Sequence, residues 1–194
     1  MPKTLLDSIP MPFAPPGTET YGFQVIQEVW DVNGERKIYW KYRLPNMVQI
    51  VPLTPEGKII GISEWQPNVG ADYLHLPGET FDEGETDPLA VAERGLLEET
   101  GYESKQITLL STILENSGRS DRLIYVCLAR ECVKATAGEK GIKAKLFSPE
   151  SFWNEMMQYF FANAGTKHGG GNTLKALTLA YQKLDWLKVA TSTV

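Results

Sequence analysis

Apolar and polar positions alternate in two runs near the start of the chain, at residues 23–30 and 38–42. Both runs are rich in β-branched and aromatic residues, which favours extended strands. Asn33-Gly34 lies between them, and a two-residue hairpin turn of this type needs a positive φ at both positions. The pattern therefore predicts an antiparallel hairpin. The first 20 residues contain five prolines and are expected to form an irregular arm.

Further apolar runs predict a larger set of strands. Residues 47–53 and 58–65 flank the turn Pro55-Glu56-Gly57, which predicts a second antiparallel pair. Residues 134–140 form a polar stretch that is expected to be a loop. Three other runs also predict strands, at residues 107–114, 123–129 and 144–147.

Two helices are expected from their end signals. Asp87 and Pro88 suit an N-cap and a first helical position, and Gly101 suits a left-handed stop, so a helix is predicted over residues 88–100. Ser148-Pro149 begins a second helix in the same way. Its apolar residues recur at helical spacing and are expected in the core: Phe152, Trp153, Met156, Met157, Phe160 and Phe161.

A last helix is predicted over residues 173–188, with Asn172 as its N-cap. Its expected buried face consists of Leu174, Leu177, Ala180 or Tyr181, and Leu184. The loop before it, residues 166–171, holds His168 and three glycines; the glycines could cradle a phosphate, and an ordinary connecting loop is the alternative. Strands around one central helix, with helices at the end, predict an α+β or mixed α/β sandwich. We expect an arm and hairpin over residues 1–43 and a main domain over residues 44–190.

Composition narrows the class of protein. The 194 residues are 42% hydrophobic and carry a formal net charge of −5, which argues against a nucleic-acid partner. No apolar run reaches about 18 residues and no basic leader precedes an apolar segment, so we expect no membrane segment and a cytoplasmic protein. Cys127 and Cys132 are too few for a disulfide framework and are expected to be reduced thiols.

The chemistry of the chain is concentrated in residues 76–102. Glu98 and Glu99 fall in the last turn of the predicted helix, where two adjacent carboxylates repel each other and oppose the helix dipole. A hard cation such as Mg²⁺ or Mn²⁺ prefers oxygen ligands and removes that cost. The alternative interpretation of this carboxylate pair is an acidic helix end that is simply exposed to solvent. The acidic turn at residues 82–85 gathers more carboxylates before the helix, which favours a metal site.

This segment resembles the Nudix box, the signature of hydrolases that cut nucleoside diphosphates linked to another group. Five residues match the box in register, and Tyr102 closes it: Arg94, Leu96, Glu98, Glu99 and Gly101. Glu85 matches if one residue is inserted near Thr86. The resemblance implies a Nudix-like α/β/α sandwich with an N-terminal β-hairpin extension. It further implies that Glu98, Glu99 and the Gly78 carbonyl hold Mg²⁺ or Mn²⁺, and that Arg94 and Glu85 orient the helix and loop; a plain salt bridge is the competing account.

Two departures from the box bear on activity. Glu79 stands where the family has glycine, and Gly95 stands where it has the glutamate that shares a metal with the last glutamate of the pair. Positions 95 and 99 share a helix face, so Gly95 marks a missing ligand. Either Glu79 supplies the missing oxygen, or the site binds metal weakly and the protein has become a nucleotide-binding or regulatory protein. A purely structural protein is a third reading, which the intact Glu98-Glu99-Thr100-Gly101 ending opposes.

Outside the box the chain resembles the ADP-ribose pyrophosphatase group, through the N-terminal hairpin, Gln66-Pro67, and residues 116–121 and 172–177. The resemblance implies a homodimer formed by the N-terminal strands, and a small nucleotide substrate with ADP-ribose as the first guess. Ser117 and Gly118 are candidate substrate contacts. Trp30, Trp40 or Trp65 could stack on a base, and core or dimer packing is the alternative for each.

Two features of that group are missing from this chain. Glu64 and Trp65 replace arginines that are common in the group on the strand before Gln66-Pro67. The acidic loop of the group is sparse here, and Glu139 is its one candidate for a catalytic base, with a surface charge as the alternative. The identity of the substrate is therefore carried over less well than the chemistry of the box.

Overall fold

The computed structural model describes residues 3–11, 22–66, 70–161 and 171–186. The chain divides into two compact units. Unit 1 comprises residues 1–46 and 113–124, and unit 2 comprises residues 47–112 and 125–194. The expected loop at residues 166–171 lies outside the described residues except for Gly171, and so do residues 12–20 of the expected arm.

Unit 1 is built on a three-stranded antiparallel sheet of order β1-β2-β3. Its strands are β1 (Lys3–Met11), β2 (Gln24–Val32) and β3 (Glu35–Arg43). Asn33 and Gly34 join β2 to β3 with φ of 60° and 83°, which confirms the predicted hairpin. The prediction of an irregular arm is wrong for residues 3–11, because they form strand β1. Proline is tolerated there because β1 is an edge strand, where a missing N–H interrupts no ladder on the open side.

The remainder of unit 1 is a loop with the strand ends that flank it, residues 113–124. It belongs to the hairpin of β9 (Gln106–Leu114) and β10 (Leu123–Arg130), both predicted as strands. The backbone N–H of Tyr42 donates to the carbonyl of Arg119 at 2.9 Å, and the N–H of Leu123 donates to Asn46 Oδ1 at 2.9 Å. These bonds fasten the loop to the end of β3.

The described residues of unit 2 form three sheets. One has the order β7-β4-β10-β9, the second β12-β5-β6, and the third β11-β8. The strands not yet given are β4 (Met47–Pro52), β5 (Ile59–Gln66), β6 (Ala71–His75), β7 (Gly78–Thr80), β8 (Tyr102–Glu103), β11 (Val133–Lys134) and β12 (Lys143–Phe147).

The predicted pairing of β4 with β5 is wrong. Both runs are strands, but they lie in different sheets and share only an isolated bridge between Leu53 and Ile59. Each strand contains at least four consecutive buried residues, so each must be covered on both faces. A tight turn brings two such strands close together without making them partners.

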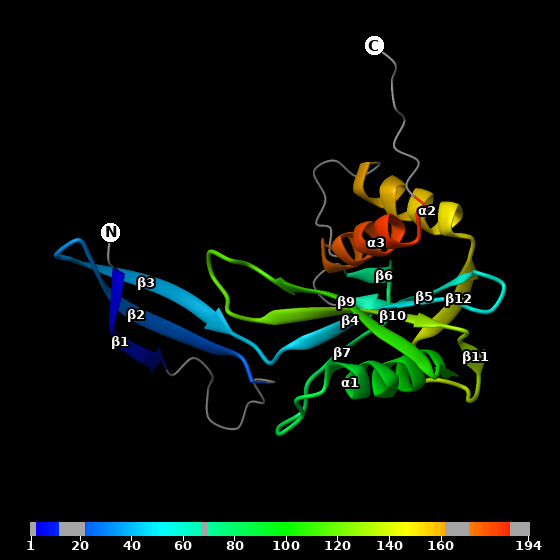
Figure 1. Cartoon of the computed structure of the whole chain (residues 1–194), viewed down its shortest axis with the longest axis horizontal. Coiled ribbons are helices and arrows are strands. Elements are labelled where there is room, and N and C mark those ends of the chain that lie inside the picture. Colours follow the sequence, from blue (N-terminus) through cyan, green and yellow to red (C-terminus); the bar gives the residue numbers. More distant parts are fainter. Residues whose placement is uncertain (1–2, 12–21, 67–69, 162–170, 187–194) are drawn as a thin grey trace, which may run out of the picture. The chain divides into compact units, whose positions relative to one another are not determined.

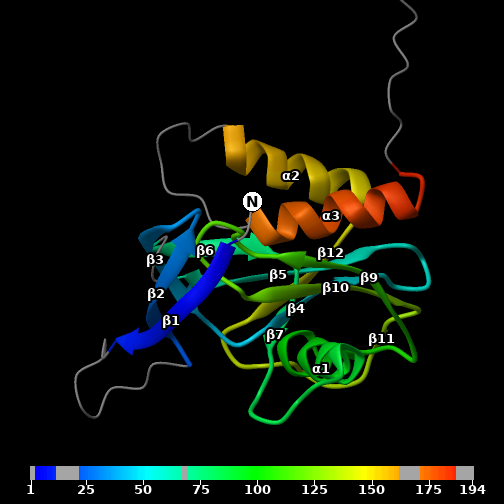
Figure 2. The same ribbon diagram turned by 60° about the vertical axis from the view of Figure 1, so that its left-hand side comes forward.

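Helices cover both sides of the sheets of unit 2 (Figures 1 and 2). α1 (Pro88–Gly95) packs on β4 and β7, whereas α2 (Pro149–Phe161) packs on β5 and β12 and α3 (Gly171–Lys183) on β4. The expected α+β sandwich is therefore confirmed. Among the described residues, no helix has the length and apolar character needed to cross a membrane.

The ends of the helices follow the sequence signals in part. Asp87 accepts a hydrogen bond from the N–H of Leu89, and Ser148 Oγ accepts one from the N–H of Ser151, so both predicted caps are confirmed. Asn172 is not an N-cap, because α3 already begins at Gly171. The same helix ends at Lys183 rather than 188, since Asp185 turns left-handed with φ 56°. Residues 187 and 188 lie outside the described part.

The core of unit 2 includes the thiols. Cys127 and Cys132 are free and buried, as predicted, and burial raises the pKa of Cys127 to about 12. On α2, Phe152 and Met156 are buried as expected, while the side chains of Phe160 and Phe161 lie outside the described ones. The buried face of α3 consists of Thr173, Ala176, Leu177, Ala180 and Tyr181. Leu174 and Leu184 are only half-buried.

Candidate functional site

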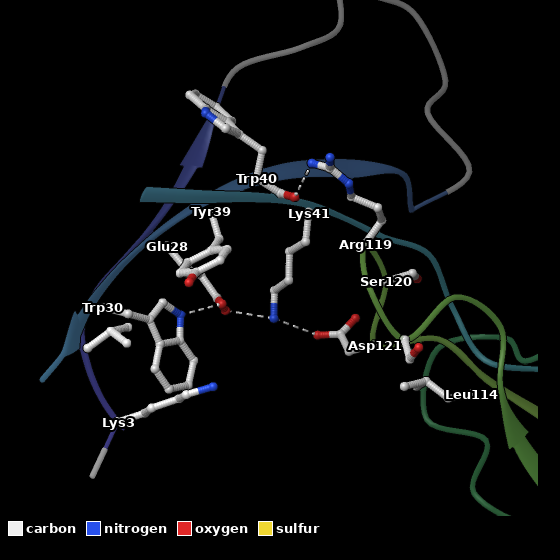
Figure 3. Close-up of a pocket in the computed structure, with 13 residues that line it drawn as sticks. Lys3, Glu28, Trp30, Tyr39, Trp40, Lys41, Leu114, Arg119, Ser120 and Asp121 are labelled. Atoms are coloured by element: carbon white, nitrogen blue, oxygen red, sulfur yellow. Dashed lines mark hydrogen bonds and ion pairs between the residues drawn. The ribbon is translucent and has the colours of Figure 1, made fainter. Parts of the chain in front are cut away.

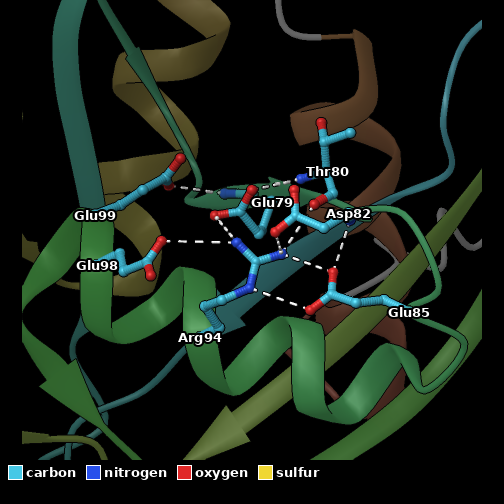
Figure 4. Close-up of polar contacts among 8 residues, drawn as sticks. Glu79, Thr80, Asp82, Glu85, Arg94, Glu98 and Glu99 are labelled. Carbon is cyan, nitrogen blue, oxygen red and sulfur yellow. Dashed lines mark hydrogen bonds and ion pairs between the residues drawn. The ribbon is translucent and has the colours of Figure 1, made fainter. Parts of the chain in front are cut away.

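The candidate site of unit 2 lies where β7 turns through a loop into α1 (Figure 4). Residues 88–100 were predicted as one helix, but only 88–95 are regular α-helix. Leu96–Thr100 form a widened π-type turn that carries both Glu98 and Glu99. Turns of this type often lie at functional sites, because they redirect side chains within an otherwise regular helix. Gly101, with φ 70°, ends the turn as predicted.

Arg94 is the cation around which the loop and helix are organised. Its Nε and Nη2 lie 3.3 and 2.8 Å from the two oxygens of Glu85, and Nη2 also donates to the carbonyl of Thr80 at 3.0 Å. Nη1 lies 3.1 Å from Glu79 Oε2 and 3.7 Å from Glu98 Oε2. The fork of Arg94 therefore ties α1 to both the loop and β7. A positioning role and a plain salt bridge both predict these contacts.

Glu79 and Gly95, the two departures from the box, lie against each other. A Cβ built at Gly95 would overlap Cβ of Glu79 and lie 3.1 Å from its Cγ. The Glu79 side chain thus fills the space beside Gly95. Neither position alone reveals this relationship in the sequence.

Glu99 is held from the strand side. The N–H of Gly78 donates to Glu99 Oε2 at 2.9 Å. Burial, together with the nearby carboxylates of Glu79, Glu64 and Glu139, raises the pKa of Glu99 to about 8, while the hydrogen bond from Gly78 opposes the shift. A divalent cation would stabilise the charged form that these surroundings disfavour.

The negative charge around Arg94 suits a hard cation nearby. We name as the carboxylate cluster the four acids that pair with Arg94 together with Glu99, which lies near Glu79: Glu79, Asp82, Glu85, Glu98 and Glu99. Four of these acids pair with one arginine, which leaves an excess of negative charge, and Mg²⁺ and Mn²⁺ prefer oxygen ligands in such surroundings. Within the described part of the chain, no three His, Cys, Asp or Glu side chains are already arranged around a common metal position. The Glu98 side chain is 56% exposed, so a cation from solvent can reach it beside Arg94.

Glu139 lies on the loop that borders the turn. Its N–H donates to the carbonyl of Glu98 at 2.7 Å, and its side chain is exposed. Lys134 Nζ donates to the carbonyl of Thr100 at 2.7 Å, which holds the start of the same loop. The loop therefore keeps Glu139 next in space to Glu98.

Unit 1 has a cleft of about 400 Å³, called here the Trp30 cleft (Figure 3). It brings together Trp30, Ser117 and Gly118, three of the expected substrate contacts. The fourth, Trp65, belongs to unit 2, where its side chain is 61% exposed. Trp40 also lines the cleft, and Arg119 Nη1 donates to its carbonyl at 3.5 Å.

Three charged residues that line the Trp30 cleft were not identified from the sequence: Glu28, Lys41 and Asp121. Lys41 Nζ lies 2.7 Å from Glu28 Oε1 and 3.1 Å from Asp121 Oδ2, and Trp30 Nε1 donates to Glu28 Oε2 at 3.0 Å. The hydrogen bond from Lys41 is the main reason that the pKa of Glu28 is lowered. A lysine between two aromatic residues of a strand, at positions 40–42, was the available signal.

The arrangement of strand, loop, helix and carboxylates defines the class of protein. Residues 44–164 match the NUDIX domain, so the chain belongs to the Nudix family. The structure is similar to a solved structure described as the crystal structure of an ADP compounds hydrolase, with a TM-score of 0.76, 18% identity and 96% of each chain covered. That likeness confirms the expected Nudix fold.

Two curated relatives are similar in sequence. The ADP-ribose pyrophosphatase of Bacillus subtilis (strain 168) is 29% identical over 106 residues, which are 55% of this chain and 57% of that protein. The methanol dehydrogenase activator of Bacillus methanolicus is 30% identical over 98 residues, which are 50% of this chain and 52% of that protein. The matched region thus spans about half the length of each relative.

Proposed function

We propose that this chain is a Mg²⁺- or Mn²⁺-dependent pyrophosphohydrolase, whose substrate is a nucleoside diphosphate linked to another moiety. ADP-ribose is the first substrate to test, because one curated relative is named for it. The observation that carries the proposal is the carboxylate cluster: four acids pair with Arg94, and Glu99 lies beside them on a Nudix box whose Glu98 and Glu99 are intact.

The roles follow from the positions of the residues. Glu98, Glu99, Glu79 and the Gly78 carbonyl would hold the cation. Such a cation offsets charge on the phosphate oxygens and lowers the pKa of a bound water. Arg94 and Glu85 fix the helix against the loop, so the carboxylates keep their spacing.

Hydrolysis needs a base for the attacking water. Glu139 is assigned that role, since its loop is fastened beside Glu98. Water attacks one phosphorus, the bridging oxygen leaves with the other phosphate, and the proton lost by water passes to the carboxylate of Glu139. ADP-ribose would give AMP and ribose 5-phosphate.

Nucleotide recognition is assigned to aromatic and loop residues. Trp30 offers an indole face in the Trp30 cleft, and Ser117 and Gly118 offer a hydroxyl and backbone groups. Trp65, exposed on β5, is assigned separately as a second stacking residue.

Residues 1–43 are proposed to form a homodimer with a second copy. Among the described side chains, β1 and β3 expose these large apolar ones, which a partner would cover: Leu5, Leu6, Ile9, Ile38, Tyr39 and Trp40. The two free thiols suit a reducing compartment, and we assign the protein to the cytoplasm on that basis.

A second function deserves a test because of Gly95. A Nudix domain that lacks one box glutamate could bind nucleotide without turning it over, and one curated relative is named as an activator rather than a hydrolase. This alternative predicts saturable nucleotide binding without product.

Product analysis separates the two functions. The protein would be incubated with ADP-ribose and related dinucleotides in Mg²⁺ or Mn²⁺, beside a Glu99→Gln variant. Release of AMP by the unmodified protein, and not by the variant, supports the hydrolase. Binding of ADP-ribose without any product supports the regulator and overturns the hydrolase.

A further inference from the structure

We propose that Glu79 replaces the carboxylate missing at position 95, so that glycine and glutamate have exchanged places between two residues in contact. The inference rests on the metal site of the proposed function. It goes further by explaining Glu79 and Gly95 together, as two positions that share the space of one side chain.

The first argument is steric. A side chain at position 95 and the present side chain at position 79 cannot both exist, because a Cβ on Gly95 overlaps Cβ of Glu79. That atom is close to the backbone and cannot swing away as the tip of a flexible side chain can. The two positions therefore share one space, which Glu79 fills from β7.

The second argument is the direction of the carboxylate. Glu79 Oε2 and Glu98 Oε2 lie 3.1 and 3.7 Å from the same nitrogen, Nη1 of Arg94. The residue before Glu79 donates its N–H to Glu99 at 2.9 Å. Glu79 is thus next to both box glutamates, at the position that a ligand from residue 95 would serve.

A structural salt bridge with Arg94 is the competing account of Glu79. Arg94 is already engaged by both oxygens of Glu85. Glycine within a helix costs about 1 kcal/mol relative to alanine, and a salt bridge on β7 gives no reason for that loss. The exchange explains Gly95 and Glu79 together.

The test measures Mn²⁺ binding directly, from the electron paramagnetic resonance signal of free Mn²⁺, so it does not depend on turnover. The variants are Glu79→Gln, Gly95→Glu, and the double exchange Glu79→Gly with Gly95→Glu. Asp82→Asn is the matched control. Asp82 also contacts Arg94, at 3.6 Å, but its side chain is 77% exposed and it is not assigned to the metal.

The exchange predicts that Glu79→Gln weakens Mn²⁺ binding about ten-fold or more, as loss of a ligand-sphere group does. Gly95→Glu alone should lower the melting temperature because of the overlap with Glu79. The double exchange should recover both the melting temperature and Mn²⁺ affinity. Asp82→Asn should bind Mn²⁺ within about two-fold of the unmodified protein, since exposed charges are screened.

Two results would overturn the inference. If Glu79→Gln and Asp82→Asn change Mn²⁺ affinity equally, Glu79 acts only as one of several negative charges around Arg94 and not as a ligand. A double exchange that folds and still binds Mn²⁺ no better than Glu79→Gln would exclude a shared ligand position. If Gly95→Glu fails to fold, the comparison of Mn²⁺ affinity between Glu79→Gln and Asp82→Asn still tests the inference. Mn²⁺ binding as expected without any product would overturn the hydrolase while leaving the exchange intact.

Discussion

The backbone N–H of Gly78 donates a 2.9 Å hydrogen bond to Oε2 of Glu99, which joins the start of β7 to the widened turn at the end of the box helix. One oxygen of Glu99 is thereby oriented by the strand. The same bond partly offsets the cost of a carboxylate whose surroundings raise its pKa. The strand and the turn therefore fix the position of this carboxylate together.

Glu99→Gln should remove the stabilisation of the protein by divalent metal. A ligand at 100 times its dissociation constant stabilises the native state by about 2.7 kcal/mol. For a protein of this size each kcal/mol moves the melting temperature by about 2–4 °C. Saturating Mn²⁺ should thus raise the melting temperature of the unmodified protein by several degrees and leave that of Glu99→Gln unchanged. An equal rise in both would remove Glu99 from the metal site.

Arg94→Lys should destabilise the box although it keeps the charge. Lysine cannot reach both oxygens of Glu85, the carbonyl of Thr80 and Glu79 at once, because it lacks the planar fork. A loss of about 1–3 kcal/mol in unfolding free energy is expected, as for hydrogen bonds to charged groups. Urea denaturation measures it.

Glu93→Gln is the control for the arginine variant, because Glu93 is the exposed neighbour of Arg94 on the same helix. Its unfolding free energy should match that of the unmodified protein. A similar loss in both variants would mean that helix α1 is sensitive to any substitution, and that the fork of Arg94 has no special part.

Local features of this fold could be predicted from the sequence, whereas pairings over long distances could not. The hairpin at Asn33-Gly34 and the cap at Asp87 depend on neighbouring residues, so they were predictable. β1 was missed because prolines suggested an irregular arm, and an edge strand tolerates them. β4 and β5 lie in different sheets because each pairs with other strands of the fold. A turn between two strands carries no information about those other partners.

The candidate site shows the same division. Glu98, Glu99, Arg94 and Glu85 were selected by their match to the Nudix box, and the structure brings Glu85 and Glu98 to Arg94. The contact between Glu79 and Gly95 could not, because it depends on how β7 packs against α1. In the same way, Lys41 and Asp121 meet only through the fold of unit 1.

Unit 1 should lose part of its stability in acid through Glu28. Its hydrogen bond from Lys41 lowers the pKa of Glu28 below the ordinary value of 4.5, against the opposing effect of burial. A carboxylate with a lowered folded-state pKa stabilises the native state above about pH 4.5, and this contribution disappears as the pH falls through the folded value. The neighbouring charges are Lys41 and Asp121.

Hydrogen exchange of the β2 and β3 amides, followed from pH 6 to pH 3, measures this effect. Protection should fall in the unmodified protein as Glu28 takes up a proton, by an amount equivalent to about 1 kcal/mol for one ion pair. Glu28→Gln should begin with lower protection at pH 6 and show a smaller fall. If protection falls by the same amount with pH in both proteins, groups other than Glu28 cause the acid sensitivity of unit 1.

Trp30→Phe tests the assignment of the Trp30 cleft to the nucleotide. Phenylalanine keeps an aromatic face but loses the indole area and the N–H that donates to Glu28, so stacking on a base should weaken. Loss of part of a stacking contact, worth about 1–3 kcal/mol per base, should raise KM for ADP-ribose several-fold with kcat little changed. Steady-state kinetics at saturating Mg²⁺ provide both constants. Trp65→Phe tests the second proposed stacking residue in the same way: a raised KM with kcat little changed would support a role for Trp65 in stacking. Unchanged KM in Trp30→Phe, with an altered sedimentation coefficient, would assign Trp30 to packing between two copies of the chain.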